Sequence, residues 1–122
     1  MPILDICIIG ELEPVLLPQL PEHLAAAAGH VFKAEPGCVW VTVRVTPLAA
    51  YAENDTGTWT GPGPVFVRVV KRIVQDSQTL ESEAQALAMA IGEVTRIPSD
   101  RVHIIYEPSA VGRVAFGGRL VT

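Results

Sequence analysis

The chain has 122 residues, of which 49% are hydrophobic and 18% are charged, and its mean hydropathy is +0.35. These values exclude an intrinsically disordered chain, which needs low hydrophobicity and a high net charge, and the length suits a single domain. The formal net charge of −4 argues against nucleic acid or an anionic membrane as the main partner. Because there is no run of about 20 apolar residues and no basic signal-peptide region, we expect a cytoplasmic protein.

The first half of the chain predicts a strand, a helix and a second strand. The apolar run 3–9, which follows Pro2, is typical of a strand. The segment 21–28 predicts a helix, because proline suits the first helical turn and its four alanines favour helix. We expect Gly29 to fray or bend the end of this helix. Valines at every second position of 39–45 predict the second strand.

The second half repeats this order after a loop at 53–63, which is rich in glycine and short polar residues. The run 65–70 follows Pro64 and predicts a strand, and 102–106 predicts another. Between them lies an apolar stripe at helical spacing, with Thr79 as the expected N-cap and Pro98 as the stop. The stripe consists of Leu80, Ala84, Leu87, Ile91 and Val94.

The two halves form an internal repeat within one domain, 1–122, with pseudo-repeats 2–60 and 64–122. The same spacing of 34 positions separates Pro2 from Pro36 and Pro64 from Pro98. A strand–helix–strand unit requires parallel strands and a right-handed crossover. Two such units predict an α+β fold in which a four-stranded mixed sheet has both helices on one face. The other face would stay uncovered, which favours an oligomer.

These features resemble the tautomerase superfamily, which includes 4-oxalocrotonate tautomerase and macrophage migration inhibitory factor. The resemblance rests on the Met1-Pro2 start, the tandem units, the segment 98–107 and the glycine hairpin 112–118 (Gly-Arg-Val-Ala-Phe-Gly-Gly). It implies a homotrimer that binds a small anionic substrate. It also implies a site at Pro2 that needs no cofactor.

The chemistry of a terminal proline agrees with this implication. Interconversion of keto and enol forms needs a group that takes a proton from one atom and returns it to another. A free α-amine titrates near pH 8, and an apolar pocket and a neighbouring cation both lower its pKa. Pro64 cannot act in this way, because its nitrogen is an amide inside the chain. The resemblance therefore implies a tautomerase or isomerase in which Pro2 is the general acid and base.

The resemblance also implies the other residues of the site. An arginine that the family places after a strand aligns with Val74, and Arg72, on the same strand face, is the nearest substitute. A second family arginine aligns with His103, and Arg113 lies at a polar position of the hairpin. We assign as catalytic residues Pro2, Arg72 and Arg113. We assign as substrate-binding residues Tyr51, Asn54, His103, Val114 and Phe116.

Other functions stay open at this stage. A catalytically silent trimeric scaffold or binding module would explain the missing arginines. Hydration or dehalogenation of an unsaturated acid would use Pro2 together with an acid such as Glu53 or Glu107. A dimeric, ferredoxin-like ligand sensor is a third alternative. The three histidines lack the spacing of metal ligands, so we expect no metal.

Overall fold

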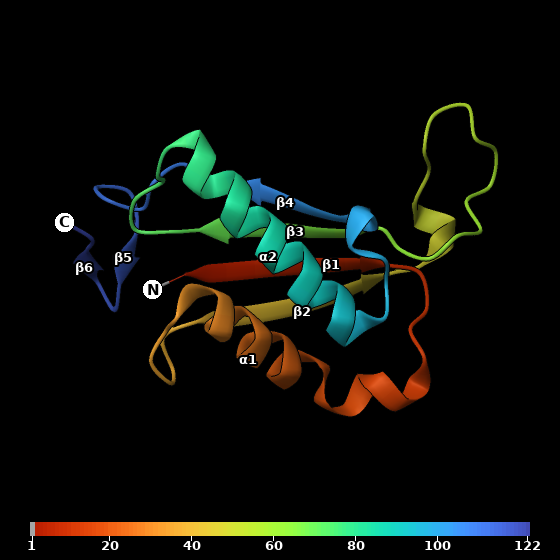
Figure 1. The fold of residues 1–122 in the computed structure, drawn as a ribbon, viewed down its shortest axis with the longest axis horizontal. Helices are drawn as coiled ribbons and strands as arrows, with labels where there is room; N and C mark the ends of the chain where they lie inside the picture. Colours follow the sequence, from red (N-terminus) through yellow and green to blue (C-terminus); the bar gives the residue numbers. More distant parts are fainter. Residues whose placement is uncertain (1) are drawn as a thin grey trace.

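The computed structural model describes residues 2–122 and contains both predicted strand–helix–strand units (Figure 1). The first unit comprises β1 (Ile3–Ile9), α1 (Leu20–Phe32) and β2 (Trp40–Thr46). The second comprises β3 (Val65–Val70), α2 (Ser77–Thr95) and β4 (Val102–Tyr106). A small hairpin, β5 (Ala115–Phe116) and β6 (Arg119–Leu120), follows near the C-terminus. Short 3-10 turns lie at Pro14–Gln19, Leu48–Ala50 and Ser99–Arg101.

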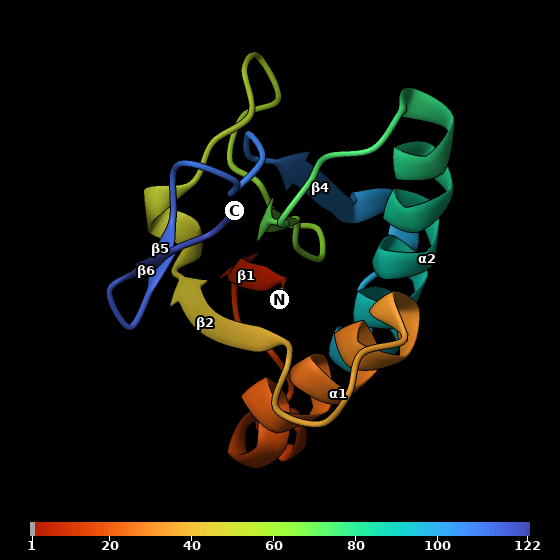
Figure 2. The ribbon, with the colours of Figure 1, turned by 90° about the vertical axis from the view of Figure 1, so that its left-hand side faces the viewer.

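The four long strands form one mixed sheet in the order β2-β1-β3-β4. Within each unit the strands are parallel, and β1 and β3 join the units in antiparallel fashion. Both helices cover one face of the sheet (Figures 1 and 2). The predicted α+β fold is therefore confirmed. The antiparallel centre pairs Ile3 with Val70, so the start of β1 lies beside the end of β3.

The core lies between the sheet and the helices. Alternate residues of the two central strands face it and are 0% exposed, namely Leu4, Ile6, Ile8, Val65, Val67 and Val69. Leu24 of α1 and Leu87 of α2 are equally buried against them. Each such side chain stabilises the fold by about 1.5–3 kcal/mol relative to its exposed state. This packing gives the start of β1 a fixed position.

The opposite face of the sheet is not covered by either helix and carries polar groups. Arg68 of β3 forms an ion pair with Glu107 at 2.9 Å, and Thr42 of β2 donates a hydrogen bond to Asp5 of β1. A face of this kind suits contact with another polar protein surface better than contact with lipid. No helix within residues 2–122 is both long and apolar enough to cross a membrane.

Two expectations about the helix ends are wrong. The N-cap of α2 is Asp76, whose carboxylate accepts a hydrogen bond from the backbone N–H of Thr79 at 2.9 Å. Gly29 does not fray α1, which continues to Phe32 and ends at Lys33 with a positive φ of 51°. Phe32 packs against the core, and this contact outweighs the cost of about 1 kcal/mol for glycine inside a helix.

Candidate functional site

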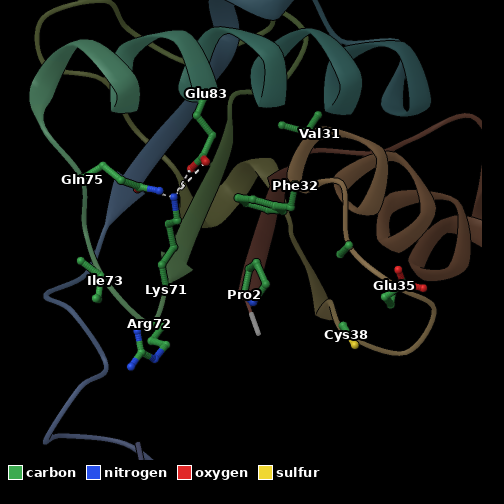
Figure 3. A pocket seen from close by; sticks show the side chains of 11 residues that line it. Pro2, Val31, Phe32, Glu35, Cys38, Lys71, Arg72, Ile73, Gln75 and Glu83 are labelled. Atoms are coloured by element: carbon green, nitrogen blue, oxygen red, sulfur yellow. Dashed lines mark hydrogen bonds and ion pairs between the residues drawn. The ribbon is translucent and has the colours of Figure 1, made fainter. Parts of the chain in front are cut away.

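A cavity of about 510 Å³ opens where β1 begins and β3 ends. The register of these two strands explains the position of the cavity, because Ile3 pairs with Val70, Pro2 directly precedes Ile3, and Lys71 directly follows Val70. Figure 3 shows the side chains around the opening. The lining residues are Pro2, Val31, Phe32, Ala34, Glu35, Cys38, Lys71, Arg72, Ile73, Gln75 and Glu83.

Two of the residues assigned from the sequence, Pro2 and Arg72, line this cavity. The Arg72 side chain is exposed, and one guanidinium N–H group donates to the backbone carbonyl of Thr122. A guanidinium has five N–H donors, so most of them remain for a ligand. Arg72 can therefore hold a carboxylate with two parallel hydrogen bonds at the mouth of the cavity that Pro2 lines.

A buried ion pair forms one wall of the cavity. The Lys71 ammonium lies 3.0 and 2.9 Å from the two carboxylate oxygens of Glu83, and it also donates to the amide oxygen of Gln75. The side chain of Lys71 is 9% exposed and that of Glu83 is 16% exposed. The ammonium also lies 5.8 Å from the centre of the Phe32 ring, a contact that favours a cation.

Tyr106 of β4 completes this polar chain. Its hydroxyl donates a hydrogen bond of 2.9 Å to Glu83. Burial raises the pKa of the Tyr106 phenol, and the bond to Glu83 raises this pKa further. The phenol is therefore a fixed hydrogen-bond donor at neutral pH, which helps to hold the Glu83 carboxylate in place beneath Lys71.

The hairpin residues border two neighbouring hollows. Arg113 and Val114 line a space of about 260 Å³ that also includes Ile3, on the uncovered side of the sheet. The Arg113 guanidinium donates to the backbone carbonyl of Pro108 at 3.1 Å. Within one chain, Arg113 thus lies outside the cavity that contains Pro2, because its own loop holds the guanidinium.

Phe116 lies closer to the Pro2 cavity. It lines a hollow of about 220 Å³ with Trp40, and the two rings meet edge to face with their centres 5.1 Å apart. Cys38 borders both this hollow and the Pro2 cavity, so the two spaces adjoin. An apolar part of a ligand at Pro2 could extend onto this aromatic pair.

The remaining assigned residues lie at the opposite end of the sheet. His103 pairs with Phe66 near the start of β3, with ring centres 5.5 Å apart. Pro2 lies near the other end of β3, and the six residues of that strand span about 20 Å, which separates His103 from Pro2. Asn54, on the exposed linker, donates to Asp55. Within one chain, the structure does not bring these residues to Pro2.

Tyr51 belongs to a separate cluster at that same end. The Tyr51 hydroxyl and the Arg101 guanidinium both donate to the carboxylate of Glu53. Arg101 also stacks on Trp59, with 4.2 Å between the guanidinium carbon and the ring centre. Burial and the neighbouring Glu53 raise the pKa of Tyr51, whereas the two hydrogen bonds lower the pKa of Glu53. This cluster fastens the linker 53–63 to the start of β4.

The sequence analysis missed Lys71, Glu83 and Gln75 as cavity residues. A signal was available, because Lys71 continues the alternation of the buried Val65, Val67 and Val69. A lysine at the next inward position of such a strand indicates a buried cation that needs a partner. Over residues 2–122, no cluster of three or more His, Cys, Asp and Glu side chains is arranged to hold a metal ion.

The chain matches no family model and no curated protein. Solved structures match nearly its whole length. Native fused 4-OT has a TM-score of 0.77 at 13% identity, over 98% of this chain and 95% of that chain. Pt0534 inactivated by 2-oxo-3-pentynoate has a TM-score of 0.76 at 17% identity, over 98% and 94%. Malonate semialdehyde decarboxylase has a TM-score of 0.68 at 17% identity, over 94% and 90%. The fold that the resemblance implied is therefore confirmed.

Proposed function

Given this shared fold, we propose that the chain is a cofactor-free tautomerase or isomerase. It interconverts the keto and enol forms of a small carboxylate substrate, with the Pro2 amine as general acid and base. The observation that carries this proposal is that Pro2 and Arg72 line the same cavity. One supplies the proton-transfer group and the other supplies a cation for the carboxylate.

The chemistry requires a free secondary amine at Pro2. An amide nitrogen has no basicity, so the active form must lack Met1, which lies outside the described residues. In that form the apolar side chains of Val31 and Phe32 disfavour a charged amine, as does the cation of Arg72, whereas Glu83 balances the charge of Lys71. We therefore expect the pKa of the Pro2 amine to lie below that of free proline.

Assembly forms part of the proposal. We propose a homotrimer that associates through the uncovered face of the sheet. Matching structures are named as a symmetric and an asymmetric trimer of fused 4-OT. His103 and Tyr51 lie too far from Pro2 to act on the same substrate within one chain. Their proposed role in substrate binding therefore depends on a neighbouring copy.

Hydration of an unsaturated acid is a second candidate, and one observation favours it. Glu35 is an exposed acid at the edge of the Pro2 cavity, and a rotation of its side chain could bring its carboxylate to an attacking water. The two acids expected for this role lie elsewhere, because Glu53 bonds to Arg101 and Glu107 pairs with Arg68. A Glu35→Gln variant that loses hydration but keeps keto–enol exchange would separate the two activities.

A mass measurement and an NMR titration test the proposal. The mass of the intact chain reports whether Met1 has been removed. A ¹⁵N-labelled sample then gives the pKa of the Pro2 amine, which we expect below that of free proline. Turnover of phenylpyruvate and 2-hydroxymuconate is measured in parallel, with Pro2→Ala as the matched variant. A normal amine pKa together with no turnover would leave only a scaffold or binding role.

A further inference from the structure

The Lys71 ammonium is a buried cation that has no direct role in the proposed reaction. It faces both oxygens of Glu83 and the amide oxygen of Gln75. An ammonium has three N–H donors, so these three oxygens match its full capacity. The backbone is held as well, because the N–H of Ala110 donates to the carbonyl of Lys71 at 2.8 Å.

The acceptors of Lys71 are not equivalent. Glu83 lies on α2, is largely buried, and is held by the Tyr106 hydroxyl at 2.9 Å. Gln75 lies on the segment between β3 and α2, is exposed, and offers a neutral oxygen. Hydrogen bonds to charged acceptors are roughly twice as strong as those to neutral ones. Gln75 is therefore the partner that a ligand would displace most readily.

We propose that Lys71 binds the reacting carbonyl oxygen of the substrate, and that the amide oxygen of Gln75 competes with the substrate for this position. The inference rests on the proposed tautomerase function and adds to it a group that binds the oxygen on which negative charge develops. Lys71 and Gln75 both line the cavity that contains Pro2. An amide oxygen and a ketone oxygen are alike as acceptors, so one can replace the other.

The role follows from where charge develops. When Pro2 removes the proton, the substrate C–H bond breaks and an N–H bond forms. The C–H electron pair becomes a carbon–carbon double bond, and the π pair of the carbonyl moves onto its oxygen. The ammonium attracts the resulting enolate oxygen more strongly than the neutral carbonyl, which lowers the barrier. Pro2 then returns the proton to this oxygen, which gives the neutral enol.

The two cations of the cavity, Lys71 and Arg72, thus have different roles. In Figure 3, the Lys71 amino group turns toward Gln75 and Glu83, whereas the Arg72 guanidinium turns away from them. Arg72 binds the carboxylate, which keeps its charge throughout the reaction. Lys71 binds the oxygen whose charge changes. Lys71 should therefore affect kcat, and Arg72 should mainly affect KM.

Opposite substitutions at Gln75 test this inference. Oxalate, which resembles the enolate of a 2-oxo acid, serves as the probe, and propionate serves as a plain carboxylate. Binding is followed through the NMR signals of Pro2 in the Met1-free protein. Gln75→Ala removes the internal competitor and should strengthen oxalate binding several-fold. Gln75→Glu supplies a charged competitor and should weaken oxalate binding by about 10-fold to 100-fold. Propionate binding should change little in either variant.

Substitutions at Lys71 complete the test. Lys71→Met should lower kcat about 10²-fold to 10³-fold and weaken oxalate binding, whereas Lys71→Arg should retain part of both. Lys33→Met removes an exposed cation at the end of α1 and is the matched control. Should Lys71→Met fail to fold, the Gln75 pair still decides the question. Equal oxalate affinity in both Gln75 variants would overturn the inference, as would equal losses for oxalate and propionate in Lys71→Met.

The two proposals can fail separately. Suppose that the wild-type protein turns over substrate but oxalate binding is unchanged by substitutions at Gln75 and Lys71. This result would refute the role of Lys71 and leave the tautomerase proposal intact. Oxalate binding that depends on Lys71, without turnover of any keto or enol substrate, would refute the tautomerase and retain the oxyanion site.

Discussion

The buried pair of Lys71 and Glu83 allows a sharp test of how this site is held together. In Glu83→Leu, the ammonium loses its only charged partner among the described residues and stays largely buried. Removing one partner of a buried pair costs about 3–5 kcal/mol. Since both side chains retain some exposure, we expect a loss of about 3 kcal/mol, the lower end of this range. Lys71→Met should destabilise the fold to a similar extent.

The double variant Lys71→Met/Glu83→Leu should recover most of that loss. Apolar replacements of a buried ion pair are often neutral or stabilising, although Tyr106 then lacks its acceptor, at a cost of about 1 kcal/mol. For a chain of this length, about 3 kcal/mol corresponds to a fall of roughly 12 °C in Tm. Thermal unfolding of the four proteins at one fixed concentration provides the double-mutant cycle.

The exposed pair of Arg96 and Glu13, which lies away from the proposed trimer interface, serves as the control. Its side chains are 57% and 59% exposed, so its cycle should give no more than about 1 kcal/mol. A coupling energy between Lys71 and Glu83 as small as that of the control would refute the reasoning. The cavity wall would then owe its shape to apolar packing alone.

Three further predictions concern the core, the helix cap and the linker. Leu87→Ala should destabilise the fold by about 2–5 kcal/mol, as measured by urea unfolding, because Leu87 is 0% exposed. Asp76→Ala should lower Tm through loss of the cap. Hydrogen bonds with Thr79 lower the folded-state pKa of Asp76, so its contribution is present above pH 4 and disappears as the pH falls through that lowered value. A Tm difference that persists at low pH would contradict this assignment. Glu53→Gln should lower the raised pKa of Tyr51 toward its ordinary value, which an ultraviolet pH titration would follow.

Local patterns predicted the elements well and their ends less well. The last long strand, 102–106, matches β4, because a compact apolar run is bounded by strong turn signals. The start of α2 was misplaced, since Asp76 and Thr79 are both good N-cap residues and only the packing of the helix on the sheet selects one. Helix α1 passes through Gly29 because Phe32 packs onto the core. Contacts of that kind are invisible in a local window of sequence.

The candidate site was predictable only in part. Pro2 and Arg72 were both chosen from the sequence and both line one cavity. His103 and Tyr51 were grouped with them, but the antiparallel pairing of β1 with β3 puts these residues at the other end of the sheet. The direction of that pairing depends on how the two halves dock, which no single motif encodes. Lys71 was missed because a lysine after a strand usually faces solvent.

The contacts between the two halves indicate that the chain can be divided at its linker into two fragments that reassociate. The linker 53–63 is largely exposed, and the halves adhere through β1 against β3 and through α1 against α2. A nick at Gly57 would leave Glu53 on one fragment and its partner Arg101 on the other. Fragment complementation should therefore succeed, with two separately expressed peptides recombining into the intact architecture. Each peptide could then be labelled on its own, so that the two ends of the sheet are observed independently.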